Sequence, residues 1–244
     1  ILEMQSRNGK PLAEKEALIL KADVSYEIGV EQAITIPFQF RLMPFEKHPI
    51  GKAARPKTID GQLKDWGKDQ INRVLQSEDP ADLSIRYGLQ YDEDFLYFAA
   101  EVQDSDLNVD TTLAIYRQDG IGLIINGALL RESVQAKGEG WYEQEAMLRI
   151  SPATADLPSV EYLSEGWPAG TQYVCRAVEG GYQLEVAFPI SYFNDRQADN
   201  WKTARINIVL QDYDSKFTEG KRLFVFPDWR YGDNVPGSGM FFKE

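Results

Sequence analysis

Residues 83–90 read LSIRYGLQ and residues 95–102 read FLYFAAEV, with the acidic segment YDED between them at 91–94. In each longer segment, every second residue is apolar and belongs to one face, which is the period of a β-strand. The Asp residues at 92 and 94 favour a tight turn, because their side chains bond to nearby backbone. The sequence therefore predicts a β-hairpin, and its apolar face needs a second layer of structure to cover it.

The rest of the chain shows the same extended pattern and no long helical period. A short helical corner is predicted at Pro189–Phe193. Further strands are predicted at 119–126, 141–150, 172–178, 182–188, 205–211, 223–226 and 238–242. Many short strands separated by turns indicate an all-β protein. We expect a two-layer antiparallel β-sandwich of jelly-roll type.

The N-terminal residues have a different organisation. Two strands are predicted at 17–26 and 32–42, with a turn at Gly29. Two strands alone rarely form a stable unit, so residues 1–46 are either a β-hairpin extension of the sandwich or the tail of an upstream β domain. Residues 47–56 combine Pro, Gly and basic residues and are interpreted as a linker. The sandwich would then span residues 57–244.

Composition restricts the partners of the chain. Its 244 residues include 26 basic and 38 acidic ones, for a net charge of −12. Nucleic acid and anionic membranes attract positive surfaces, so neither is an expected partner. Apolar runs are too short for a bilayer, so membrane insertion is not expected. Cys175 is the single cysteine, which excludes an intramolecular disulfide and is read as a small buried apolar residue.

Several motifs occur in the order found in one known family. They are IDG at 59–61 followed by Trp66, FLYFAAEVQD at 95–104, and QDGIGLII at 118–125. From about Lys57 to the C-terminus, the chain resembles a family 9 carbohydrate-binding module, a member of the DOMON-like β-sandwiches. The resemblance implies a non-catalytic module that binds a glycan or polysaccharide. It also implies an appendage of a larger polysaccharide-acting or cell-surface bacterial protein, whose other domains would be partners. An extracellular, cell-surface or periplasmic location follows.

The resemblance also implies a binding site. In the family, two aromatic side chains enclose a terminal sugar, and here these positions correspond to Tyr116 and Trp229. The polar residues of the site correspond to Arg149, Asn207 and Gln211. Flat aromatic faces stack on the C–H patches of a pyranose, while planar polar groups bond to its hydroxyls. We therefore expect both aromatic side chains to lie on an exposed face. A family carboxylate is replaced here by Gly122.

An acidic loop follows the predicted hairpin. Asp104, Asp106 and Asp110 recur at short intervals, and such oxygen ligands suit Ca²⁺. Modules of the resembled family can carry structural calcium. The alternative is a solvated acidic turn, because the loop lacks a Gly-centred twelve-residue ligand pattern.

Three other functions remain open. A glycosidase needs a pair of carboxylates facing one bond, and no motif marks such a pair. Haem binding, known in DOMON-like sandwiches, needs axial ligands, but the single histidine, His48, falls in the predicted linker. A structural spacer without sugar binding would need none of these residues.

Overall fold

The computed structural model describes residues 18–27, 33–42, 46–128, 145–198, 200–214, 220–230, 233–234 and 238–244. The chain falls into two compact units, residues 1–46 and 47–244. In the first unit, β1 (Leu18–Glu27) pairs antiparallel with β2 (Ala33–Leu42), in a register that runs from Leu18 opposite Leu42 to Glu27 opposite Ala33. The predicted N-terminal hairpin is therefore present. Whether it belongs to an upstream domain stays a prediction.

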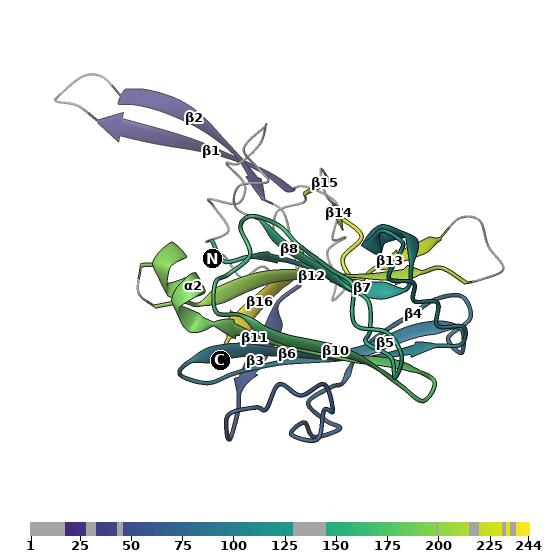
Figure 1. Cartoon of the computed structure of the whole chain (residues 1–244). Coiled ribbons are helices and arrows are strands. Elements are labelled where there is room, and N and C mark those ends of the chain that lie inside the picture. The colour runs from purple at the N-terminus through teal and green to yellow at the C-terminus, as the bar shows by residue number, and fades with distance from the viewer. Residues whose placement is uncertain are drawn as a thin grey trace. The chain divides into compact units, whose positions relative to one another are not determined.

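The second unit is built from two layers of strands (Figure 1). One layer has the order β10-β11-β6-β5-β3, and β4 pairs with the first half of β5 while β3 pairs with its end. These strands are β3 (His48–Lys52), β4 (Arg73–Gln76), β5 (Leu83–Tyr91), β6 (Phe95–Asp104), β10 (Gln172–Val178) and β11 (Gly181–Pro189). The predicted hairpin is β5 with β6, paired from Leu83 opposite Asp104 to Tyr91 opposite Leu96.

The other layer has the order β16-β12-β7-β8-β9, with β13 also paired to β12. Its strands are β7 (Gly120–Asn126), β8 (Ala146–Ile150), β9 (Glu161–Leu163), β12 (Thr203–Asp212), β13 (Lys221–Phe224) and β16 (Met240–Lys243). A separate pair joins β14 (Trp229–Arg230) to β15 (Asp233–Asn234). The described helices are the short η1 (Ile115–Arg117) and α2 (Ile190–Arg196), the latter at the predicted corner.

Strand β3 corrects the predicted linker. It pairs parallel with β16 on one side and with β5 on the other, so it connects the two layers into one curled sheet. Ile50 at its centre is fully buried. Residues 47–56 thus contain part of the sandwich. The Pro- and Gly-rich composition obscured a strand that is stabilised by partners distant in the sequence.

The apolar faces predicted from the two-residue period form the core between the layers. The main buried cluster includes Leu83, Ile85, Tyr87, Leu89, Leu96, Phe98, Ala100, Val102, Ile121, Leu123, Ile125, Ile206, Ile208 and Leu210. Burial of this many large apolar side chains is the main favourable contribution to folding. The all-β sandwich predicted from the sequence is confirmed.

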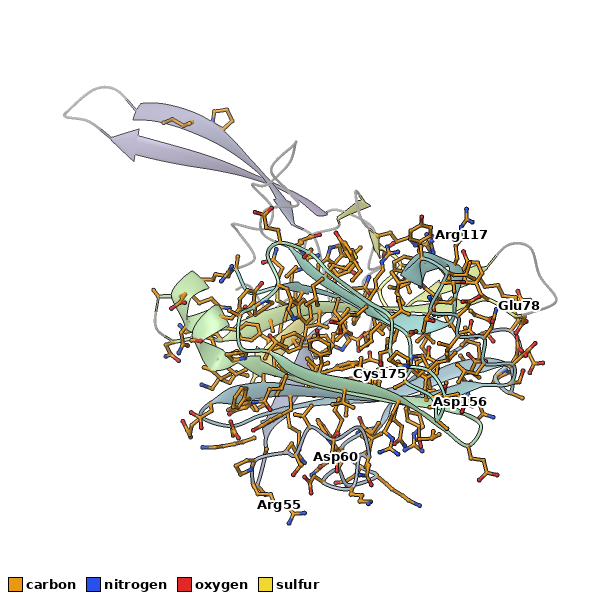
Figure 2. The ribbon with its side chains drawn as sticks, viewed as in Figure 1. Arg55, Asp60, Glu78, Arg117, Asp156 and Cys175 are labelled. Atoms are coloured by element: carbon orange, nitrogen blue, oxygen red, sulfur yellow. The ribbon has the colours of Figure 1, made fainter. Side chains whose placement is uncertain are left out.

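The alternation of residues suggests that the other face of β6 is exposed. In the structure this face is covered. Tyr97 and Ala99 form a second buried cluster with Ala53, Trp66 and Ile71. The coil that contains Arg55 and Asp60 lies below the lower layer in Figure 2. The Nε1–H of Trp66 donates to Oε1 of Glu185 at 3.1 Å, and the amide of Gly61 donates to Oε2 at 2.7 Å.

A close backbone approach explains Gly88 on the same face. A Cβ at this position would lie 1.8 Å from the carbonyl oxygen of Gln70. Any other residue would therefore push the covering segment away from the sheet.

Candidate carbohydrate-binding face

The candidate site lies on the outer face of the layer that contains β7, β8 and β12. Adjacent strands place Tyr162, Arg149, Gly122, Val209 and Phe224 opposite one another in a single row. Alternation along β12 buries Ile208 and Leu210 between the layers. It follows that Asn207, Val209 and Gln211 face the opposite side, because neighbouring residues of a strand point in opposite directions.

Tyr116 lies on η1 and is 47% exposed. Two buried glutamines hold this segment. Gln118 donates to the carbonyls of Asp110 and Leu113, both at 3.1 Å, and Gln211 donates to the carbonyl of Ile115 at 2.9 Å. Tyr116 is therefore an exposed aromatic ring on a well-anchored support, as expected for a stacking residue.

Arg149 is half-buried on β8, and its guanidinium is held from two sides. Nη1 donates to Oε1 of Gln211 at 3.3 Å, and Nε approaches Sδ of Met147 at 3.4 Å. Gly122, opposite Arg149, has no side chain that could cover it. The structure thus brings together three of the predicted residues, with Gln211 bonded to Arg149 and to the residue before Tyr116.

Gln211 itself is almost completely buried. Its amide oxygen accepts from Arg149 and its amide nitrogen donates to Ile115. Its role in this arrangement is to position the arginine and the η1 segment relative to each other.

Asn207 is fully buried and its amide is used within the protein. Nδ2 donates to the carbonyls of Trp229 at 2.6 Å and Phe226 at 3.0 Å, while Oδ1 accepts from the amides of Phe226 and Ile208. These bonds hold residues 226–229 against β12. The geometry makes Asn207 a support for that segment.

The expectation that Trp229 is exposed is wrong. Its side chain is fully buried, and the guanidinium of Arg205 lies 4.0 Å from the centre of its ring. Its Nε1–H donates to Oε1 of Glu145 at 2.9 Å. The sequence could not show this, because the covering groups come from β12 and from the residue that precedes β8. A buried ring with an occupied N–H cannot stack on a sugar in this conformation.

Tyr162 is an exposed aromatic residue that the sequence analysis missed. It lies on β9 opposite Arg149 and is 50% exposed. The sequence pattern predicts no strand between residues 150 and 172, whereas the structure has the three-residue strand β9 there. The alternation of Glu161, Tyr162 and Leu163 was the available signal, but it is short.

The three carboxylates predicted to bind a metal do not converge. Asp110 is partly buried and accepts hydrogen bonds from the amide and hydroxyl of Thr112. Among the described residues, the acidic or histidine side chains that do meet are Asp82, Asp212 and Asp214, with ligand oxygens within 4.8 Å of one another. Asp104 is buried near this group. Of the three predicted metal ligands, it is the one that the structure places there.

His48, the single histidine, and Cys175, the single cysteine, both pack against other residues of the fold. His48 lies in β3, with its ring 5.3 Å from that of Phe226 and 5.2 Å from that of Phe241. Cys175 is fully buried, which raises the pKa of its thiol far above the usual range. In the parts of the chain that the structure describes, no helix has the length and apolar character needed to cross a membrane.

Comparison with known proteins identifies the class. The family described as "Carbohydrate family 9 binding domain-like" matches residues 59–230, so the chain belongs to this family. Two solved structures of a family 9 carbohydrate-binding module from Caldicellulosiruptor kristjanssonii are similar, one in complex with cellotriose and one with glucose. Both are 14% identical, with a TM-score of 0.57 over 82% of this chain and 94% and 96% of theirs. No curated protein matches the sequence.

Proposed function

We propose that this chain binds a carbohydrate on the outer face formed by β7, β8, β9 and η1. The observation that carries the proposal is the juxtaposition of Tyr116, Arg149 and Tyr162. One half-exposed phenol ring comes from β9, which pairs with β8, and the other from η1, which contacts β8; an anchored guanidinium lies on β8 itself. Family membership supports this assignment.

The chemistry of these groups suits a pyranose. The ring faces of Tyr116 and Tyr162 offer apolar surface to the C–H groups of a sugar, and burial of an aromatic face contributes strongly to binding. Arg149 offers planar N–H donors that can bond to two neighbouring hydroxyls. Gln211 fixes the guanidinium before the ligand arrives, which lowers the entropic cost of binding.

A glucose-based oligosaccharide is the proposed ligand class. The similar modules were solved with cellotriose and glucose, which makes β-linked glucans the first ligands to test. Gly122 stands where the resembled family has a carboxylate, so one partner for a sugar hydroxyl is missing. We therefore propose a weaker dependence on a free reducing end than that carboxylate would give.

The proposed biological role is non-catalytic. The chain would act as an appendage that holds a larger polysaccharide-acting or cell-surface protein close to its glycan, in an extracellular, cell-surface or periplasmic location. A structural spacer is the alternative, and a spacer would bind no glycan.

The test is a glycan array followed by calorimetric titration with cellotriose. We expect Tyr116→Ala and Tyr162→Ala each to weaken binding by roughly 5- to 100-fold, the effect of removing an aromatic anchor. Arg149→Met should weaken it similarly while keeping most of the apolar stem. Val74→Ala, which removes an exposed apolar side chain from β4 in the other layer, is the control.

Two results would overturn the proposal. Absence of binding to every glycan would favour the spacer. Glycan binding that all three site variants retain would place the site elsewhere on the molecule. Hydrolysis of a chromogenic glycoside by the purified protein would contradict the non-catalytic role.

A further inference from the structure

The candidate carbohydrate-binding face continues to the edge of its layer. In the part of the chain that the structure describes, β9 is the last strand of this layer, and its three residues are all exposed. Neighbouring strands lie about 4.8 Å apart, so Tyr162 and Gly122, on either side of Arg149, are about 10 Å apart. This distance is wider than one pyranose ring. The face therefore has room for more than one sugar unit.

The floor of the face beside Arg149 is closed by aliphatic groups. A Cβ on Gly122 would lie 2.5 Å from Cγ1 of Val209 and 3.6 Å from Cγ of Arg149. A valine methyl and an arginine methylene thus fill the space over Gly122, and neither group accepts hydrogen bonds. An anomeric hydroxyl, which only the reducing end of a glycan carries, therefore finds no side-chain acceptor at this position.

Trp229 does not form a second wall of the face. Its ring is fully buried under the guanidinium of Arg205, and its N–H donates to Glu145. The residue that was expected to enclose a terminal sugar together with Tyr116 takes no part in the face in this conformation. A chain end therefore has no enclosure formed by these two rings.

Exposed apolar side chains are concentrated near β8. In the described part of residues 47–244, the large apolar residues that are exposed are Val74, Leu113, Tyr116, Tyr162 and Leu163. Four of these five come from β9 or from η1 and the residues just before it, and both β9 and η1 contact β8. Apolar groups that gather on one part of a soluble protein mark a binding surface. The surface here is an open strip and not a single stacking residue.

The charge of the chain favours a neutral ligand. The net charge is −12, which repels polyanions such as chains of uronic acids. The planar N–H groups of Arg149 bond equally well to the hydroxyls of an uncharged sugar. We therefore expect a glycan without carboxylates or sulfates.

We propose that this face binds the interior of a linear, uncharged glycan chain. The rings of Tyr116 and Tyr162 stack on different sugar units, and Arg149 bonds to hydroxyls between them. The chain leaves the sheet over β9. A free reducing end is not required, because these contacts use groups that every unit of the chain carries. This inference rests on the proposed function and adds the mode of binding to it.

The experiment compares ligands with and without a reducing end by calorimetric titration of the full chain. The first pair is cellohexaose and borohydride-reduced cellohexaose, in which the terminal ring is opened. We expect the two dissociation constants to agree within about 2-fold. The third ligand is a long, soluble mixed-linkage β-glucan, and several protein molecules should bind to each of its chains. These measurements use the unaltered protein, so they do not depend on the folding of any variant.

Two variants test whether the rings contact different sugar units. Tyr116→Ala and Tyr162→Ala should each weaken cellohexaose binding by roughly 5- to 100-fold, the effect of removing an aromatic anchor. Only one of them, or neither, should weaken glucose binding, because a single sugar unit contacts one ring. Val74→Ala, which removes an exposed apolar side chain from β4, is the matched control and should change neither affinity. Melting curves of all variants verify their folding.

Three results would overturn the interior mode and leave glycan binding itself in place. They are loss of binding when cellohexaose is reduced, one protein molecule bound per β-glucan chain, and weaker glucose binding in both tyrosine variants. The last result would mean that the two rings enclose one sugar. Tighter binding to polygalacturonate than to β-glucan would contradict the neutral ligand. Absence of binding to every glycan would instead overturn the proposed function, and the interior mode with it.

Discussion

The two ends of strand β12 carry buried charges that have opposite kinds of neighbours. Near its start, Arg205 is completely buried, lies over the ring of Trp229 and interacts with Glu145, which also accepts the indole N–H. At its end, Asp212 belongs to an acidic cluster of three residues, Asp82, Asp212 and Asp214, with Lys221 beside it. Charges of opposite sign are close together at the first end, and charges of the same sign at the second.

This difference separates a buried group with charges of both signs from one with an excess of negative charge. Buried charges are tolerated when they have partners, so the Arg205–Glu145–Trp229 group can be explained by the protein alone. The acidic cluster cannot be explained in the same way, because removing an aspartate from it reduces repulsion. We therefore expect removal of the Trp229 side chain at the first end to destabilise the protein, whereas removal of an aspartate at the second end should not.

The largest effect is expected from Trp229→Ala. Removing a fully buried indole leaves a cavity and should lower the free energy of unfolding by about 3–5 kcal/mol. Urea denaturation would measure this, with Tyr116→Ala as the control, since an exposed ring should change stability by less than about 0.5 kcal/mol. Equal stability of the two variants would show that Trp229 is not a core residue.

Glu145→Gln should have a smaller effect on the free energy of unfolding, and this effect should depend on pH. Burial raises the pKa of Glu145 in the folded protein to about 7 from its ordinary 4.5. The folded state therefore binds this proton more tightly, so its contribution to stability is present below about pH 4.5 and is lost as the pH rises towards 7. The total from this group is at most about 3 kcal/mol.

The comparison of wild type and Glu145→Gln isolates this group, because Gln keeps an oxygen that can accept from Trp229. Urea denaturation from pH 4.5 to 7.5 should show a steeper fall for the wild type. Parallel pH profiles would contradict the raised pKa.

Asn207→Ala should have an intermediate effect. The substitution leaves the carbonyl of Trp229 and the amide of Phe226 without their bonds to this side chain, and unsatisfied buried groups cost about 1–3 kcal/mol. Chemical denaturation should show this loss. Asn207→Asp keeps the acceptor for Phe226 but loses the donor to Trp229, so it should recover only part of the stability. A full loss of glycan binding with unchanged stability would instead make Asn207 a direct ligand contact.

The smallest effect is expected from Lys221→Met at the acidic end. This variant should lose up to about 1 kcal/mol of stability, the range for exposed ion pairs, because the aspartates lose their lysine. Thermal melting would measure the loss. An unchanged or higher melting temperature would mean that the lysine does not stabilise the aspartates.

The strands could be predicted from the sequence because they depend on the local alternation of apolar and polar residues. The apolar faces of β5, β6, β7 and β12 follow directly from residues two apart, and each lies in the core. The motifs at 59–61, 95–104 and 118–125 also indicated the family, which the match over residues 59–230 shows. Tyr116 and Arg149 were named for the site from these motifs, and the structure brings their segments together through Gln211.

Burial and convergence were decided by the tertiary structure. The sequence predicts that Trp229 is exposed, but Arg205 and Glu145 cover it in the folded chain. The sequence likewise predicts a linker where β3 pairs with β16 and β5. The acidic cluster has the same origin, because Asp82 and Asp212 are far apart in the chain and meet where the two layers end. The sequence alone determined which residues form strands and which face of each is apolar, since both are properties of neighbouring residues. Which outward residues stay exposed, and which carboxylates meet, depends on how distant strands pack, and only the folded chain decides that.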